Sequence, residues 1–209
     1  MQLTAEFVVS AASAADFPKD GAPEVAVVGR SNVGKSSLIN ALVRRSVART
    51  SAAPGKTRLI NYYRVRPAGG PAWYLADLPG YGYARGGTGA RQTFERMAGE
   101  YFGRHQGRKS GTSPRSPRRH LAGALLLIDA RHPDLAQDAE AHAWLEATAL
   151  PVVVVAAKID KLTRAERVRA GQQWEHSYDG PVLPVSAVTG EGLKELWTLI
   201  DRLTRNPAP

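Results

Sequence analysis

Residues 29–36 read GRSNVGKS and match the pattern G-x-x-x-x-G-K-[ST]. The apolar, β-branched run EVAVV at 24–28 comes directly before the match, and the helix-compatible stretch KSSLINALV begins at its end, at 35–43. A strand, a glycine-rich turn and a helix in this order are the context in which the pattern forms a phosphate-binding loop. The stretch therefore predicts a P-loop and an α/β fold around it.

The residue types of this loop suit a magnesium-bound nucleoside triphosphate. Gly29 and Gly34 give the backbone the freedom to aim its N–H groups inward at phosphates. Lys35 places an ammonium against the outer phosphates, and the positive end of the following helix adds its own attraction for anions. Ser36 offers its hydroxyl to Mg²⁺. The loop residues between the two glycines, which we also expect at the nucleotide, are Arg30, Ser31, Asn32 and Val33.

The rest of the chain alternates short β-branched runs with longer helix-compatible stretches, which is the pattern of a mostly parallel sheet covered by helices. We expect six strands, at 24–28, 62–66, 73–77, 122–129, 152–157 and 182–185. We expect five helices, at 35–44, 91–101, 136–148, 164–178 and 193–204. The predicted architecture is a single α/β domain over residues 1–209, with a six-stranded, mostly parallel sheet and helices on both faces.

The composition is that of a globular protein, with 43% hydrophobic and 22% charged residues among 209. The chain contains no cysteine, which excludes disulfides, thiolate metal sites, iron–sulfur clusters and cysteine nucleophiles. Its longest uncharged stretches are too short to span a bilayer, and its first residues lack the features of a secretory signal. We therefore expect a cytoplasmic protein that is a monomer and is not attached to a membrane.

The formal net charge is +9, from 28 Lys and Arg against 19 Asp and Glu, which favours a polyanionic partner such as nucleic acid. Six of the basic residues lie between 104 and 119 without an acid among them. The same stretch is rich in Pro, Gly and Ser, which predicts a mobile loop insertion at about 104–119. It is either a solvated excursion of the chain or a contact with RNA phosphates.

A second cluster of candidate residues follows the fifth and sixth expected strands. Asp160 can accept hydrogen bonds from the N1–H and the N2 amine of guanine, whereas adenine offers an acceptor at N1 and no amine at C2. Lys158 can lay its stem over the base, and the backbone N–H groups of Ser186 and Ala187 can reach the guanine O6. The alternative is a solvated turn in which Asp160 caps a helix. The neighbours that we expect at the base are Ala157, Ile159 and Val185.

Six blocks of the sequence are distinctive when they are taken together. They are GRSNVGKSSLIN at 29–40, PGKTRLIN at 54–61, DLPGYGYA at 77–84, IDARH at 128–132, AKID at 157–160 and VSA at 185–187. The chain resembles the EngB family of ribosome-biogenesis GTPases in these blocks, over about residues 7–203. The resemblance implies a Ras-like P-loop GTPase fold with GTP, GDP and Mg²⁺ as ligands. It also implies a switch in the assembly of the large ribosomal subunit, on which normal cell division and septation depend.

By this resemblance, Thr57 is the switch threonine whose hydroxyl reaches Mg²⁺ when a γ-phosphate is present, so Ser36 and Thr57 are the expected metal ligands. Asp77 holds a water of the Mg²⁺ ion, and Gly80 donates its backbone N–H to the γ-phosphate. Loss of that phosphate frees both loops. The further residues that the resemblance places at the nucleotide are Gly55, Lys56, Arg58, Leu59, Leu78 and Pro79.

Three features depart from the pattern of such enzymes. Ala157 stands where this family has Asn or Thr, so a side-chain hydrogen bond that braces the guanine pocket against the P-loop is missing, and weaker affinity is expected. Tyr81 stands where Ras-like enzymes have a Gln that orients the attacking water, which predicts slow intrinsic hydrolysis. The segment 105–119 is longer and more basic than the family leads us to expect.

The roles of several residues stay open at this point. Asn32 is either a ligand for K⁺, which would offset charge beside the β- and γ-phosphates, or a cap of the loop. Tyr81 and Tyr83 either pack in the core or stack on RNA bases. The resemblance marks Arg131 and His132, and its pattern continues to Asp138 and Trp144, without revealing a role for them. No residue is assigned to catalysis.

Three functions compete. The first is a GTPase switch on a pre-ribosomal particle. The second is a GTP/GDP-sensing module that binds RNA or the ribosome and whose hydrolysis is negligible. The third is an ATP-dependent kinase or transporter-type protein, for which no acceptor-binding element or transporter signature is visible in the sequence.

Overall fold

The computed structural model describes residues 3–48, 59–82, 87–103 and 121–205, with residues 87–91 and 93 described by their backbone alone. Several residues that the sequence singles out lie outside this part of the chain. They are Gly55, Lys56, Thr57 and Arg58 of the switch block, Tyr83, and the basic segment 104–119. What the sequence implies for them stays a prediction.

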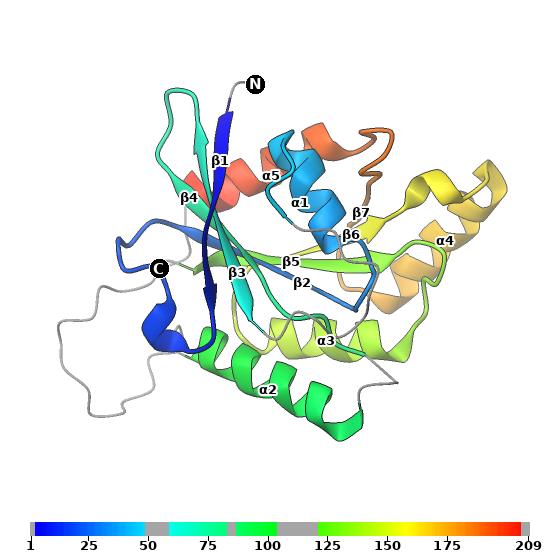
Figure 1. Ribbon diagram of the computed structural model, residues 1–209. Helices are drawn as coiled ribbons and strands as arrows, with labels where there is room; N and C mark the ends of the chain where they lie inside the picture. Colours follow the sequence, from blue (N-terminus) through cyan, green and yellow to red (C-terminus); the bar gives the residue numbers. More distant parts are fainter. Residues whose placement is uncertain (1–2, 49–58, 83–86, 104–120, 206–209) are drawn as a thin grey trace.

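A seven-stranded sheet runs through the molecule with the strand order β1-β3-β4-β2-β5-β6-β7 (Figure 1). Strands β4, β2, β5, β6 and β7 are parallel to one another, whereas β3 pairs antiparallel with β4 and β1 pairs antiparallel with β3. The strand bounds are Leu3–Ala11 for β1, Glu24–Gly29 for β2, Ile60–Pro67 for β3, Trp73–Asp77 for β4, Leu121–Asp129 for β5, Val152–Ala157 for β6 and Val182–Pro184 for β7.

The expected count of six strands is wrong by one, because the first described residues form β1 at the edge of the sheet. A bulge between Phe7 and Val9 interrupts the register of β1 with β3. Phe7 and Val8 are both exposed, so buried and exposed residues do not alternate along the strand. The alternation of apolar and polar residues with a period of two is the main sequence signal for a strand with one buried face, and β1 lacks it.

The five expected helices are confirmed, and they cover both faces of the sheet (Figure 1). Helices α1 and α5 pack on one face, and α2, α3 and α4 pack on the other. Within the described ranges, no helix is long and apolar enough to cross a membrane. The bounds are Lys35–Val43 for α1, Gly87–Gly103 for α2, Ala136–Glu146 for α3, Arg164–Ser177 for α4 and Leu193–Arg205 for α5, with short 3-10 helices η1 at Ala14–Asp16 and η2 at Ile159–Lys161.

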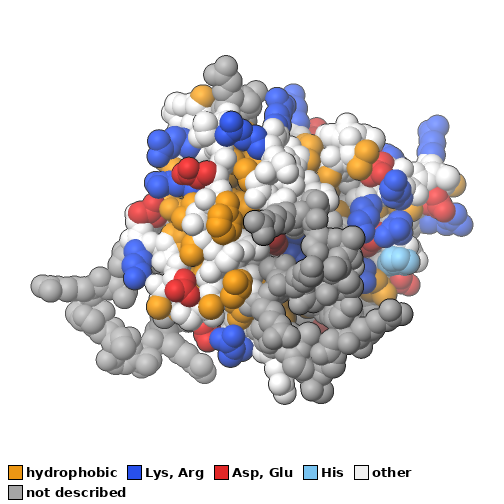
Figure 2. Space-filling model, viewed as in Figure 1, with side chains coloured by type: hydrophobic (Ala, Val, Ile, Leu, Met, Phe, Trp, Pro, Cys, Tyr) orange, Lys and Arg blue, Asp and Glu red, His pale blue; other side chains and the backbone are white. Residues whose placement is uncertain are grey.

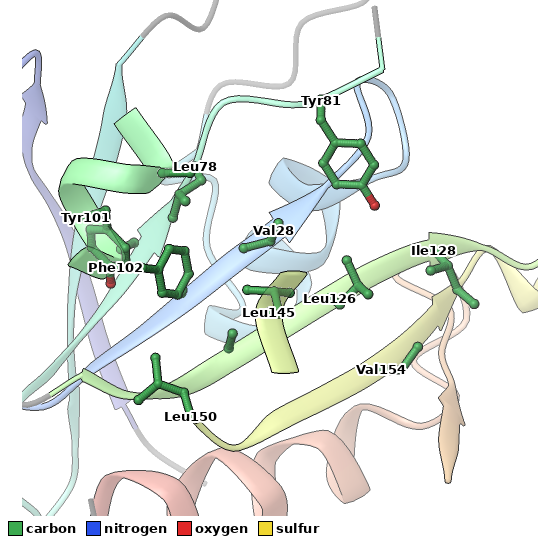
Figure 3. Close-up of a cluster of buried hydrophobic side chains, with 14 of the residues drawn as sticks. Val28, Leu78, Tyr81, Tyr101, Phe102, Leu126, Ile128, Leu145, Leu150 and Val154 are labelled. Atoms are coloured by element: carbon green, nitrogen blue, oxygen red, sulfur yellow. The ribbon is translucent and has the colours of Figure 1, made fainter. Parts of the chain in front are cut away.

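Strand β5 lies at the centre of the core, and all nine of its residues are buried. Because successive side chains of a strand point to opposite faces, Leu125 and Leu127 pack in the cluster that contains α1 and α5, whereas Leu126 and Ile128 pack in the cluster that contains α2, α3 and α4. Figure 3 shows this second cluster, with Leu145 of α3 beside Leu126. Strands buried on both faces hold the loops at their carboxyl ends, where α/β folds bind ligands.

Candidate nucleotide-binding site

The glycine-rich loop joins β2, which ends at Gly29, to α1, which begins at Lys35. Gly34 precedes the helix with a φ of 117°, a left-handed conformation that glycine adopts without strain. Asn32 also has a positive φ, 63°, which Asn tolerates better than most residues. Val33 is buried in the core. Gly34 has no side chain to cap the first turn of α1, so the N–H groups at this helix end remain for a ligand.

The ammonium of Lys35 lies across this loop. Its Nζ donates to the carbonyl oxygens of Gly29 at 3.1 Å and of Arg30 at 3.4 Å. Burial lowers the pKa of Lys35, and the negative charge of Asp77 opposes that shift. Neutral carbonyls are weaker partners for an ammonium than an anion is, so a phosphate in this loop would improve the surroundings of Lys35.

Asp77 is a buried acid at the end of β4, and the positive charge of Lys35 lies close enough to affect its pKa. It is 4% exposed, and burial raises its pKa to about 6 although the Lys35 charge acts in the other direction. Its Oδ1 atom is buried and has no hydrogen-bond partner among the residues that the structure describes. This oxygen and the hydroxyl of Ser36, in the first turn of α1, are a donor set that fits Mg²⁺, which prefers oxygen ligands and keeps several waters.

The segment after β4 lies against the P-loop. The N–H of Leu78 donates to a carbonyl of β2 at 3.1 Å, and the N–H of Ser31 donates to the carbonyl of Tyr81 at 3.1 Å. A Cβ atom on Gly80 would lie 2.7 Å from the backbone nitrogen of Ser31, closer than real Cβ atoms approach. Glycine is therefore required at this position, and Pro79 and Gly80 are held beside the loop that is expected to bind phosphates.

Tyr81 packs inside the molecule, which decides between its two open roles. It is 8% exposed, its ring centroid lies 5.6 Å from that of Phe94, and Figure 3 shows it among the buried side chains. Its hydroxyl donates to Oδ1 of Asp138 at 2.8 Å. Burial, with the nearby negative charge of Asp138, raises the pKa of this phenol far above its usual value. Stacking on an RNA base is therefore not available to Tyr81 in this arrangement.

Lys158 joins the base end of the site to the P-loop. It follows Ala157, the last residue of β6. Its Nζ donates to the carbonyl oxygen of Asn32 at 2.7 Å and to Oδ2 of Asp129 at 2.9 Å. The methyl group of Ala157 cannot make the bracing hydrogen bond whose loss was expected from the sequence. Lys158 nevertheless provides a direct link between the base motif and the loop.

Asp129, at the end of β5, fixes this lysine and was missed in the sequence. Arg131 binds the same carboxylate through Nε at 2.9 Å and Nη2 at 2.7 Å, which gives it a role, whereas His132 is exposed. Burial alone would raise the pKa of Asp129, but the hydrogen bonds from Arg131 and Lys158 outweigh it and hold that pKa well below its usual range. The signal in the sequence was an acid and a base two positions apart at a strand end.

The carboxylate of Asp160 is held in place by Ser186. The buried Ser186 hydroxyl donates to Oδ1 of Asp160 at 2.6 Å, and this hydrogen bond lowers the pKa of Asp160. The backbone N–H groups of Val188 and Thr189 donate to the same hydroxyl oxygen at 3.1 Å and 3.0 Å, which orients it. Asp160 is thus an ionised acceptor in a fixed orientation, as recognition of guanine requires.

The structure differs from two possibilities that the sequence offered for Asp160 and Ser186. Asp160 does not cap the next helix, since Thr163 is the N-cap of α4. The N–H of Ser186 is not available to guanine O6, because the loop turns back before α5 and this N–H donates to the carbonyl of Glu191 at 2.9 Å. The N–H of Ala187 remains a candidate, with no partner among the described residues.

The structure thus brings the expected residues to one edge of the sheet as two groups. The P-loop lies with 77–80, and 157–160 lies with 185–187, where the N–H of Ile159 donates to the carbonyl of Val185 at 3.2 Å. Leu59 is half-buried immediately before β3 and is the one residue of 55–59 within the described ranges.

The depressed pKa of Asp129 predicts how stability depends on pH. The folded-state pKa of Asp129 lies below the ordinary value of 3.8, so its ionic contacts stabilise the folded protein fully above about pH 4. This contribution to the free energy of unfolding decreases as the pH falls further. We expect Asp129→Asn to lower the free energy of unfolding by about 1–2 kcal/mol at about pH 7, with a difference that shrinks between about pH 5 and pH 3. Urea unfolding of the nucleotide-free protein measures this.

The exposed acid Asp134 provides the matched control, because Asp134→Asn changes the same charge in the same loop region without a buried contact. A deficit of Asp129→Asn that stays constant from about pH 7 to pH 3 would contradict the prediction.

Comparisons with known proteins agree on one family. Residues 24–158 match the family model described as 50S ribosome-binding GTPase. The chain is 41% identical to a probable GTP-binding protein EngB of Pelotomaculum thermopropionicum, over 95% of this chain and 94% of that protein. It is 38% identical to a protein of the same name from Chlorobaculum tepidum, over 97% of this chain and 98% of that protein.

Solved structures show the same fold. The crystal structure of a probable GTP-binding protein EngB is similar with a TM-score of 0.62 at 23% identity, over 88% of this chain and 99% of that chain. Era in complex with MgGDPNP and nucleotides 1506–1542 of 16S ribosomal RNA is similar with a TM-score of 0.68 at 25% identity, over 89% of this chain and 58% of that chain. The expected P-loop GTPase fold is confirmed. Since the sequence matches span nearly the whole of both chains, the protein belongs to the EngB family of GTP-binding proteins.

Proposed function

We propose that this chain is a GTP-dependent switch that acts in the assembly of the large ribosomal subunit and hydrolyses GTP slowly. One observation carries the proposal: a P-loop with a half-buried lysine and an oriented, ionised Asp160 lie at the same edge of the sheet, linked through Lys158. The first suits a triphosphate and the second selects guanine. The ribosome-binding name of the matched family model supports the choice of partner. In this proposal residues 1–209 act as one GTPase domain.

Binding of the triphosphate follows from where the charges lie. Lys35 would exchange its carbonyl partners for phosphate oxygens, which are stronger acceptors. The N–H groups at the start of α1 and the N–H of Gly80 would face the same phosphates. Ser36 and Thr57 would hold Mg²⁺, with Asp77 reaching it through a water. When bound, the ion supplies positive charge against the phosphate oxygens.

The surroundings of Tyr81 support slow hydrolysis. Its hydroxyl donates to Asp138 and its pKa is far above neutrality, so this side chain neither orients an attacking water as Gln does nor removes a proton from it. Acceleration then has to come from a partner or from a cation. The same observation favours a second candidate, the GTP/GDP-sensing module in which nucleotide exchange sets the state.

Asn32 is the residue through which K⁺ would act. Its backbone carbonyl accepts from Lys158 at 2.7 Å, whereas its exposed side-chain amide makes no hydrogen bond within the described part of the chain. The loop-capping alternative needs such a bond. A cation at the amide oxygen would offset the charge that develops between the β- and γ-phosphates.

The charge of the chain supports RNA as part of the partner. Figure 2 shows Lys and Arg side chains dispersed among acidic ones over the viewed face. The stretch 104–119, outside the described residues, holds six basic residues and no acid. We assign the contact with ribosomal RNA to this stretch, with affinity from phosphates and little sequence choice. The proposed location is the cytoplasm, and the family resemblance ties loss of the protein to defects in cell division and septation.

Replacing Asp160 by Asn tests the selection of guanine. The change removes a charged acceptor and places an amide donor against the base. We expect the affinity for GDP to fall about 10- to 100-fold, because one charged hydrogen bond contributes about 1.5–3 kcal/mol. Isothermal titration calorimetry measures it, with Glu175→Gln on exposed α4 as the matched control. Equal affinities of the two variants would show that Asp160 does not contact the base.

Single-turnover hydrolysis in KCl and in NaCl tests the cation site. We expect wild type to hydrolyse GTP about 10-fold faster in KCl, because a cation would stabilise the transition-state charge. The informative variant is Asn32→Gly, which tolerates the φ of 63° but lacks the amide, and it should lose the difference between the salts. Its affinity for GDP serves as the control for an intact loop. A wild type with the same rate in both salts excludes a role for K⁺.

Co-sedimentation of the full chain with large ribosomal subunits and their precursors tests the proposed partner and the switch together. We expect pelleting with a non-hydrolysable GTP analogue to exceed pelleting with GDP, and to weaken steeply as salt rises. Small subunits and the Asp160→Asn variant are the controls. Equal pelleting in both nucleotide states would contradict the switch, and absence of pelleting would contradict the partner. If subunits leave single-turnover hydrolysis unchanged, the sensing module is the better account.

A further inference from the structure

Asp138, the hydrogen-bond partner of the Tyr81 hydroxyl, is a fully buried acid. It lies in the first turn of α3, and none of its surface is exposed. Burial of a carboxylate costs free energy unless charged or hydrogen-bonding partners compensate for it. The partners of Asp138 therefore indicate why the residue is there.

Those partners come from the two segments that lie beside the expected phosphates. Oδ1 of Asp138 accepts from the hydroxyl of Tyr81 at 2.8 Å, and its two oxygens lie 3.1 Å and 3.3 Å from Nε of Arg30. Arg30 is the second residue of the P-loop, and Tyr81 directly follows Gly80. One carboxylate on α3 thus holds both segments.

The backbone of Tyr81 is fixed as well. Its carbonyl accepts from the N–H of Ser31 at 3.1 Å, and Tyr81 and Arg30 form an isolated parallel β-bridge. The ring packs on Phe94, with the two ring centroids 5.6 Å apart. Asp77, three residues before Gly80, ends a strand of the sheet. Gly80 is therefore anchored on both sides, and its N–H has a defined place beside the loop.

We propose that Asp138 is a positioning residue that sets the preference for GTP over GDP by anchoring Tyr81, and with it the N–H of Gly80, beside the P-loop. The inference rests on the proposed function, in which Gly80 donates to the γ-phosphate. A donor that is already in place does not lose conformational entropy when its acceptor arrives, so pre-positioning strengthens the contact. GDP has no third phosphate, so its binding gains nothing from a fixed Gly80 N–H, whereas the contact of Asp138 with Arg30 supports the P-loop that both nucleotides share.

A purely structural role for Asp138 makes a different prediction. If the carboxylate served only to attach α3 to the sheet, its loss would lower stability and would affect both nucleotides alike. The ratio of the two affinities therefore separates the roles, and stability alone does not.

Two variants weaken the same hydrogen bond from its two ends. Tyr81→Phe keeps the ring in its core position and removes only the hydroxyl. Asp138→Asn keeps the shape and removes the charge. Glu140→Gln is the matched control, because it makes the same chemical change to an exposed acid on the same helix. Calorimetry on the full chain with GDP and with a non-hydrolysable GTP analogue gives a pair of dissociation constants for wild type, for each single variant and for the Tyr81→Phe, Asp138→Asn double variant, and thermal unfolding reports whether each variant is folded.

We expect Tyr81→Phe to weaken binding of the GTP analogue about 3- to 10-fold, in line with one hydrogen bond, while GDP binding stays within about twofold. Asp138→Asn also weakens the contact with Arg30 of the P-loop, so it should weaken binding of the analogue at least as much, and by a larger factor than it weakens GDP binding. The double variant should lose little more than the larger single loss, because the hydrogen bond that Tyr81→Phe removes is already weakened in Asp138→Asn. Glu140→Gln should match wild type with both nucleotides.

The proposal is overturned if folded Tyr81→Phe binds both nucleotides as wild type does, or if the two affinities fall together. Tyr81→Phe keeps the test decisive even if Asp138→Asn fails to fold, because the phenylalanine preserves the packing. A wild-type chain that binds neither nucleotide would instead contradict the proposed function itself, so the two failures are distinguishable.

Discussion

The opposite charges of Lys35 and Asp77 lie at the carboxyl edge of the sheet, and the rest of the site depends on them. Burial lowers the pKa of Lys35 and raises that of Asp77 to about 6, although each charge favours the ionised form of the other. Groups of this kind cost free energy until partners compensate for their lost water. Lys35 has carbonyl partners, and Oδ1 of Asp77 has none among the described residues. An anion at Lys35 and a cation beside Asp77 would relieve both, and the relief would appear as binding free energy.

The buried strands of the sheet hold Lys35 and Asp77 in place, so that neither charged group can move out into solvent. Val27 of β2 and Asp77 of β4 are register partners in parallel strands, and the strands around them are buried on both faces. The base end of the site is tied to the same frame, because Lys158 spans from the end of β6 to the carbonyl of Asn32 and to Asp129 at the end of β5. Through this bridge the P-loop and residues 157–160 are held together although the side chain of Ala157 contributes no hydrogen bond.

Local patterns predicted what local patterns can determine. The P-loop was identifiable from eight residues, and the last helix was expected at 193–204, close to its bounds of Leu193–Arg205, because periodicity and glycine placement act over a few neighbours. Strand β1 was missed because its bulge and exposed Phe7 remove the alternation that marks a strand. The engagement of the Ser186 N–H was missed because it depends on how the loop before α5 folds back.

Contacts between distant segments were beyond the sequence for the same physical reason. Tyr81 and Asp138 are 57 residues apart, and no propensity or spacing announces that their side chains meet at 2.8 Å. The departure at Tyr81 was visible in the sequence, and the slow hydrolysis expected from it stays a prediction. The hydrogen bond that Tyr81 makes with Asp138 instead could be seen only in the structure, which places the segment after β4 and the start of α3 together.

Tyr81 connects the proposed slow hydrolysis with the proposed contact between Gly80 and the γ-phosphate. A Gln that orients water must reach toward the reacting phosphate, whereas a phenol that points into the core pulls the same backbone position inward. The ring of Tyr81 packs on Phe94 and its hydroxyl meets the buried Asp138, so its backbone is held against Ser31. One side chain cannot occupy both places. In the proposed function, slow hydrolysis and a fixed Gly80 would therefore both follow from the direction of this one side chain.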